Sequence, residues 1–203
     1  MTEQQERPAP DASQRLTISV AMPPDLDTVL TLLRSASAAR ATPGLPGWGE
    51  DFPDVERDLP AGLVYLARLG GEPAGTFVLR WSDHPVWGLD DGDAGYLHRL
   101  ATAPAFAGQG LGARLVAAAE ALVRSQGGRW LRLDTDRDNA RLRAWYEGLG
   151  FRHAGDTDML KRVTGPGYRW ASRYQRDLSG TGSDSNDDSN GDGSAGGTGN
   201  NGG

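Results

Sequence analysis

Hydrophobic and polar residues follow two patterns along the chain, and together they predict a sheet covered by helices. A period of two residues predicts seven strands, at residues 16–20, 62–69, 74–81, 96–102, 129–135, 151–154 and 168–174. A period of about 3.6 residues predicts helices at 23–39, 54–59, 111–126 and 139–149. The glycine pair 70–71 joins the second and third strands as a hairpin. This order predicts the α/β class, with a mixed sheet and helices on both of its faces.

A glycine-rich loop separates the fourth strand from the helix that begins at Leu111. The strand ends at Pro104, and Gly108, Gly110 and Gly112 follow. A helix start has unpaired backbone N–H groups and carries roughly half a positive charge. Glycines without Cβ atoms let a pyrophosphate approach such a start closely. The sequence therefore predicts a phosphate site at this loop.

One interpretation of the loop is a dinucleotide site. Gly108, Gly110 and Ala113 fit the G-x-G-x-x-G/A pattern, and Asp134 lies about 20 residues further on, where a ribose-binding acid would stand. However, residues 104–107 separate the strand from the first glycine, whereas that fold needs the glycine almost at once. The chain before the polar segment at 179–203 is also too short for the remaining strands and crossover helices.

The loop and a later block resemble the GCN5-related N-acetyltransferase (GNAT) family. That family's loop reads Gln or Arg, two residues, Gly, one residue, then Gly or Ala; Gly110 and Gly112 match, but Ala107 stands in the first position. The later block comprises residues 133–135, Asn139 and the sequence WYEGLGF at 145–151. Backbone amides do most of the phosphate binding in such a loop, so we expect it to survive the change at Ala107.

The resemblance covers residues 16–176 and implies both a fold and a reaction. The fold would be a twisted, mostly antiparallel mixed sheet of six or seven strands with about four helices. The reaction would be transfer of an acetyl group from acetyl-CoA to a primary amine of a small molecule or peptide, by direct attack in a ternary complex. The absence of cysteine removes the commonest covalent alternative.

The resemblance also implies which residues contact the CoA. Backbone groups of the fourth strand would pair with the pantetheine arm, because the fourth and fifth strands separate there in this family. The expected contacts are Leu100, Ala101, Thr102, Ala107, Gly108, Gln109, Gly110, Leu111, Gly112, Ala113, Asn139 and Tyr146. For Asn139, an ordinary helix cap is an equally good interpretation.

Two residues are candidates for proton transfer. Tyr146 matches the family tyrosine that donates a proton to the departing thiolate, although a packed aromatic residue in a helical stripe is the alternative. His98 shares one predicted strand face with Tyr96, Leu100 and Thr102, and it is the candidate base. A histidine that is hydrogen-bonded in the sheet or that only shapes the pocket is the alternative. Rival bases are Asp83, Asp93 and Glu50.

Composition limits the other possibilities. With no cysteine, the chain has no disulfide or thiolate metal site, and we expect no metal. The net charge is −6, but four aspartates of residues 179–203 leave 23 acidic and 21 basic residues elsewhere, so no nucleic-acid partner is expected. No apolar stretch approaches the roughly 18 residues of a membrane helix, which predicts a cytoplasmic protein. One domain at 16–178 is predicted, with disordered segments at 1–15 and 179–203.

The acceptor is the least determined part of the prediction. Trp48, Trp81, Trp87 and Tyr96 line the pocket in one interpretation and pin loops to the core in the other. The loop acids Glu50, Asp51, Asp83, Asp90, Asp91 and Asp93 favour a cationic amine. A domain that binds acyl-CoA without turnover, as a sensor or scaffold, is the alternative function. A homodimer is a further expectation, because dimers are common in the resembled family.

Overall fold

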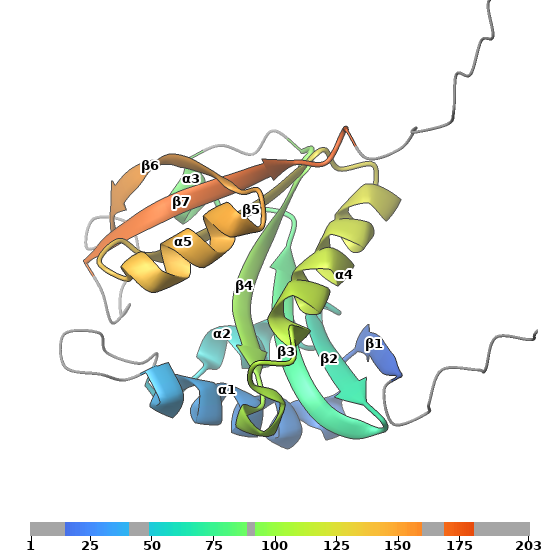
Figure 1. Ribbon diagram of the computed structural model, residues 1–203. Coiled ribbons are helices and arrows are strands. Elements are labelled where there is room, and N and C mark those ends of the chain that lie inside the picture. Colours follow the sequence, from blue (N-terminus) through green and yellow to red (C-terminus); the bar gives the residue numbers. More distant parts are fainter. Residues whose placement is uncertain (1–14, 41–48, 89–91, 160–168, 181–203) are drawn as a thin grey trace, which may run out of the picture.

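The computed structural model describes residues 15–40, 49–88, 92–159 and 169–180, and its centre is a seven-stranded sheet (Figure 1). The strands are β1 (Leu16–Val20), β2 (Val64–Leu69), β3 (Glu72–Arg80), β4 (Ala94–Thr102), β5 (Trp130–Asp136), β6 (Arg152–Asp158) and β7 (Trp170–Asp177). Their order across the sheet is β1-β2-β3-β4-β5-β7-β6. All neighbours are antiparallel except β4 and β5, which are parallel.

Within the described ranges, five α-helices accompany the sheet. They are α1 (Leu26–Arg40), α2 (Pro53–Asp58), α3 (His84–Trp87), α4 (Leu111–Ser125) and α5 (Ala140–Gly148), with short 3-10 helices at η2 (Pro23–Asp25) and η3 (Pro104–Phe106). Figure 1 shows α4 and α5 on the same side of the sheet, with α5 over β7. None of the described helices has the length and apolar content to cross a bilayer.

Alternation along the strands builds a core on each face. Phe77 and Leu79 pack with α4, whereas Val78 between them packs with α1 and α2. Leu115 of α4 and Leu33 of α1 are fully buried in these two cores. Each such leucine contributes about 1.5–3 kcal/mol relative to an exposed one. The sheet is therefore held from both sides, and its position relative to the start of α4 is fixed.

The predicted class, the seven strands and the helices on both faces are confirmed, with changes of detail. The hairpin turn is only Gly70-Gly71, both with positive φ, so β3 begins at Glu72. Helix α3 was not predicted, because four residues are too few to show a period. The single parallel pair rules out the doubly wound parallel sheet of the dinucleotide interpretation. The predictions for residues 1–14 and 181–203, and for Trp48, Asp90 and Asp91, lie outside the described residues.

Candidate active site

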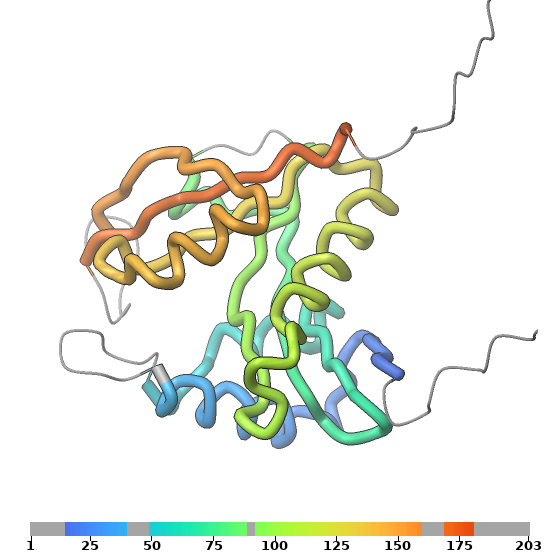
Figure 2. Tube along the Cα trace, viewed as in Figure 1, coloured from blue at the N-terminus to red at the C-terminus, as the bar shows by residue number. Residues whose placement is uncertain are grey.

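The glycine loop connects β4 to α4, and Figure 2 shows the course of the backbone through this connection. Gly108 and Gly110 have φ angles of 76° and 70°, a region that residues with side chains rarely adopt. A Cβ at either position would meet no atom within 4 Å. The residues of the loop from Ala107 to Gly110 are exposed. The loop therefore presents bare backbone to an open space, as a bound phosphate requires.

The first turn of α4 has free hydrogen-bond donors. Gly110 is the residue before the helix, and no side chain caps it. Among the described residues, nothing accepts a hydrogen bond from the N–H groups of Leu111, Gly112 or Ala113. The first turn holds no acidic residue, so the positive end of this 15-residue helix is not neutralised. Donors and dipole together form an anion site at the predicted loop.

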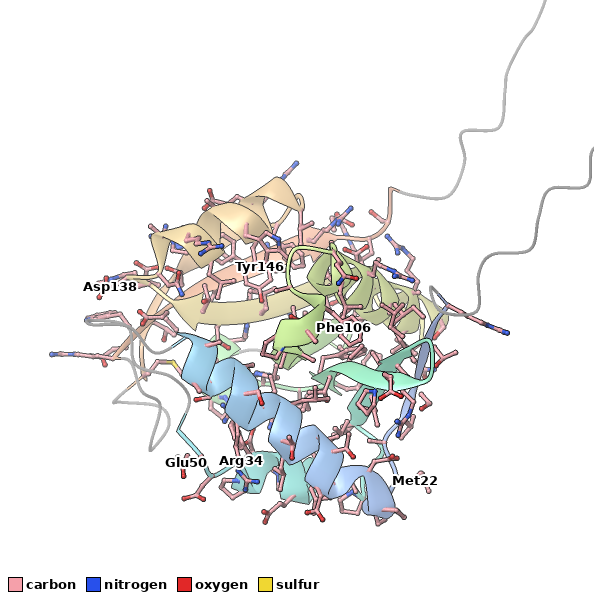
Figure 3. All side chains as sticks on the ribbon, turned by 60° about the horizontal axis from the view of Figure 1, so that its bottom comes forward. Met22, Arg34, Glu50, Phe106, Asp138 and Tyr146 are labelled. Atoms are coloured by element: carbon pink, nitrogen blue, oxygen red, sulfur yellow. The ribbon has the colours of Figure 1, made fainter. Side chains whose placement is uncertain are left out.

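Gly112 has a different role from the two exposed glycines. A Cβ there would lie 3.2 Å from Cζ2 of Trp145, which comes from α5. The missing side chain lets the start of α4 and the middle of α5 pack closely. Figure 3 labels Tyr146, which belongs to α5, and Phe106, which lies at the end of η3 in the segment that leads into α4. The loop and the candidate acid thus come from adjacent helices.

Strands β4 and β5 separate halfway along β4. Their last paired residues are Leu97 and Leu133, after which β4 continues beside β3 alone. From His98 to Thr102, no described strand pairs with the edge of β4 that faces β5. This fork is where the pantetheine contacts of Leu100, Ala101 and Thr102 were predicted, and those contacts remain a prediction.

A β-bulge changes which residues of β4 share a face. The register with β3 shifts between Thr76 and Val78, and Arg99 has a φ of 52°, an uncommon value outside glycine. Leu100 consequently packs with the α4 core, as Leu97 does. The prediction that Leu100 shares a face with Tyr96 and His98 is therefore wrong, because the extra residue of the bulge reverses the alternation.

His98 lies between two carboxylates on the face opposite α4. Its Nε2 is 3.5 Å from Oδ2 of Asp83, and its Nδ1 is 4.0 Å from Oδ1 of Asp134. The three side chains are 15%, 7% and 8% exposed. Burial lowers the pKa of His98 to about 3, and the charges of Arg80 and Arg99 add to this effect. The imidazole is therefore neutral at pH 7, with a pKa well below the 6.5 of the sequence-based expectation.

Asp134 is the neighbour that sequence reasoning missed. It was considered as a ribose-binding acid and as part of the family block at 133–135, but not as a partner of His98. Asp134 follows Leu133, and His98 follows Leu97, which pairs with Leu133. Parallel pairing of β4 with β5 in this register places the two side by side. Neither the direction of this pairing nor its register was visible in the sequence.

An ion-pair group supports the bulge from α2. Arg99 makes two hydrogen bonds, each of 3.0 Å, to Asp54. Arg80 binds Asp58 at 2.6 Å and Asp54 at 3.2 Å. Burial opposes ionisation of Asp54, but Arg99 and Arg80 outweigh it and lower its pKa below the usual value. These contacts tie α2 to β3 and β4 beside His98.

Tyr146 and Asn139 occupy positions consistent with both of their interpretations. The Tyr146 ring is 7% exposed and packs against Trp145, Phe151 and Tyr174, with ring centroids 4.9, 5.7 and 6.4 Å away. Asn139 caps α5, because its Oδ1 accepts a 3.0 Å hydrogen bond from the N–H of Leu142. The cap is thus observed, whereas contacts of Asn139 and Tyr146 with CoA remain predictions.

The rival bases Asp93, Glu50 and Asp83 lie at different distances from His98. Asp93 precedes β4 and lies at the end of the strand away from the fork, where its carbonyl accepts hydrogen bonds from Arg129 and Trp130. Glu50 is exposed, and its carbonyl binds Arg34 of α1. Of the three rival bases, the structure brings only Asp83 to His98.

The described aromatic residues that were predicted either to line the pocket or to pin loops also differ in their burial. Trp87 and Tyr96 are 6% and 1% exposed and belong to a core, with Arg132 stacked on Trp87, so both pin the loop to the sheet. Trp81 is 40% exposed. The pocket-wall interpretation therefore fails for Trp87 and Tyr96.

Comparison with known proteins connects this geometry to a family. A sequence model of the Acetyltransferase (GNAT) family matches residues 32–151, which include the glycine loop, the fork and Tyr146. The chain belongs to the acetyltransferase (GNAT) family. The resemblance derived from the two sequence blocks is thereby confirmed.

Individual GNAT relatives agree with this assignment. The chain is 35% identical over 114 residues to the uncharacterized N-acetyltransferase YesJ of Bacillus subtilis (strain 168), a match that covers 53% of this chain and 62% of YesJ. A GNAT-family acetyltransferase from Listeria monocytogenes shares the fold with a TM-score of 0.65 and 24% identity, over 81% of this chain and 95% of that one. The N-acetylglutamate synthase of Neisseria gonorrhoeae was solved with coenzyme A and N-acetylglutamate. Its structure matches with a TM-score of 0.60 and 18% identity, and the match covers 81% of this chain and 35% of that one.

Proposed function

We propose that the protein is an acetyl-CoA-dependent N-acetyltransferase that acts on a primary amine in a ternary complex, in the cytoplasm. One observation carries the proposal: within a GNAT-family chain, an uncapped helix start with bare glycine backbone adjoins the fork between β4 and β5. Pyrophosphate binds at Gly108–Ala113, and the pantetheine arm lies along Leu100–Thr102. Gln109 and Ala107 line the pyrophosphate site through their backbone.

The transfer step follows from the groups around the fork. The amine nitrogen attacks the thioester carbonyl carbon, and the carbon–sulfur bond breaks. The amine proton passes to His98, directly or through water, and leaves from there to solvent, because the lowered pKa of His98 makes the imidazole a weak base that does not keep the proton. Tyr146 donates a proton to the leaving thiolate. Positioning of the two reactants side by side supplies much of the rate enhancement.

Acetyl-CoA binding and turnover test this function separately. Calorimetric titration should show acetyl-CoA binding and no NAD binding. Release of free CoA thiol is then measured with panels of cationic, neutral and acidic amines, and the proposed cationic preference predicts the highest rates with the first panel. Binding without turnover of any amine would favour the sensor or scaffold function, and absence of acetyl-CoA binding would refute both.

Replacement of Tyr146 by Phe isolates the acid. We expect the turnover number to fall about 100-fold or more, because a positioned general acid contributes about that much, with little change in acetyl-CoA affinity. Tyr174→Phe is the matched control, since that hydroxyl binds Glu147 and Arg143 while its ring packs beside Tyr146. Unchanged turnover in Tyr146→Phe would remove the acid role and leave the packed-aromatic interpretation.

A further inference from the structure

Three side chains from different parts of the fold converge beside the fork. Asp83 precedes α3, His98 lies on β4 and Asp134 lies on β5. One donor atom from each residue lies within 4.8 Å of the other two. All three side chains are largely buried. Arg80 and Arg99, whose charges lower the pKa of His98, are themselves bound to Asp54 and Asp58.

The imidazole of His98 faces an electrostatic conflict in this group. Its Nε2 is buried and makes no hydrogen bond to any described residue, although most buried polar atoms in proteins have a partner. A neutral imidazole has one N–H and one lone pair. Because a carboxylate oxygen faces each ring nitrogen, at 3.5 and 4.0 Å, one lone pair always points toward a carboxylate. A cation held among the three groups removes this repulsion.

The dimensions distinguish a metal ion from an ammonium group. Ligand atoms about 2.0–2.2 Å from a tetrahedral metal lie about 3.4 Å from one another. Three acceptors of an ammonium, at about 2.9 Å from its nitrogen, would lie about 4.7 Å apart. The 3.5 Å between His98 and Asp83 fits the metal. Asp134 lies 4.0 Å from the other ring nitrogen, Nδ1, so the imidazole or Asp134 must turn before one nitrogen and both carboxylates face the same point. One ligand atom from each of the three residues already lies within 4.8 Å of the other two.

We propose that Asp83, His98 and Asp134 form a binding site for a divalent transition-metal ion of the Zn²⁺ type, with a fourth position open to solvent. One imidazole nitrogen and two carboxylates suit Zn²⁺ better than Mg²⁺ or Ca²⁺, which prefer oxygen donors alone.

Metal titration of the full chain tests the site without acetyl-CoA or amine. Calorimetry on protein stripped with a chelator should show one Zn²⁺ per chain and much weaker Mg²⁺ binding. In Asp83→Asn and His98→Gln, we expect the Zn²⁺ dissociation constant to rise about 10-fold or more. His153→Gln is the matched control, because His153 lies on the surface, 2.9 Å from Asp156, and offers a carboxylate–histidine pair outside the cluster.

The outcomes separate cleanly. Weaker Zn²⁺ binding in the two cluster variants with unchanged binding in His153→Gln supports the site. Equal Zn²⁺ binding in all variants would refute the site. Loss of Zn²⁺ binding in His153→Gln alone would refute it too, as would a wild-type protein that binds no Zn²⁺. Circular dichroism checks that each variant folds, and Asp134→Asn replaces any that does not. A Zn²⁺ ion on His98 would occupy the nitrogen lone pair that accepts the amine proton under the proposed function, so support for the site would remove His98 as the base. Because no transfer is measured, the metal titration itself does not depend on the proposed function.

Discussion

Replacement of Gly110 by Ala tests whether the loop conformation and the CoA site are the same feature. Gly110 has a φ of 70°, and a Cβ there would meet nothing within 4 Å. The free protein therefore has room for the methyl group, and the cost comes from the backbone alone. A residue with a side chain in this left-handed region costs about 1–2 kcal/mol. For a chain of this size, each 1 kcal/mol lowers the melting temperature by about 2–4 °C.

Ligand binding should respond more strongly than stability. The space that is empty in the free protein is the space that the pyrophosphate occupies under the proposed function. A methyl group there removes close backbone contact, so we expect acetyl-CoA affinity to fall about 10-fold or more, which corresponds to about 1.4 kcal/mol. Gly110→Asn separates the two effects, because Asn tolerates positive φ better than Ala. It should recover stability but not acetyl-CoA binding.

Gly127 provides the control at the opposite end of the same helix. Its φ is 77°, and a Cβ there would also meet nothing within 4 Å. Gly127→Ala should therefore lose a similar amount of stability while acetyl-CoA binding stays unchanged. Thermal unfolding and calorimetric titration measure the two quantities. Wild-type acetyl-CoA affinity in Gly110→Ala, or equal loss of affinity in Gly127→Ala, would refute the loop as the pyrophosphate site.

Three further substitutions test ion pairing and packing around the site. Because the pKa of Asp54 is lowered in the folded protein, its ion pairs stabilise fully above its unfolded pKa near 3.9 and lose this effect as the pH falls through the folded pKa. Asp54→Asn should thus cost about 1–3 kcal/mol in urea unfolding at pH 7 and less near pH 3; a difference independent of pH would contradict the ion-pair argument. Gly75→Ala would place a Cβ 2.8 Å from the Ala101 carbonyl and from Leu115, so we expect a loss of about 1–3 kcal/mol in thermal unfolding. Gly148→Ala, in open space within α5, should instead leave stability equal or higher.

Local patterns in the sequence were sufficient for the elements and for the loop. Each of these features can be recognised from a few neighbouring residues. They include the period of the strands, the spacing of Leu115 and Val116 in α4, and the glycines at 108 and 110. Helix starts and turns obey rules of the same short range. For this reason the glycine loop was placed correctly before α4, together with its unpaired amides.

The remaining features depend on contacts between distant residues. Nothing near Arg99 in the sequence indicates a positive φ, and its partner Asp54 comes from α2. The bulge therefore could not be predicted, and the face of Leu100 was wrong as a result. The meeting of His98 with Asp134 depends on strand register, and the low pKa of His98 depends on burial. Such properties belong to the assembled sheet and have no local signal.

The position of β7 between β5 and β6 has a consequence for how the chain folds during synthesis. Among the described strands, β6 pairs only with β7, which is made later. Until residues 170–177 emerge, β5 keeps an open edge, and the aromatic layer of Tyr146 lacks Tyr174. Open strand edges recruit other chains, and long-range pairing slows closure. The nascent protein is therefore most prone to aggregation just before its last strand inserts, and substitutions that weaken β7 should reduce soluble yield more than they reduce the stability of the finished fold.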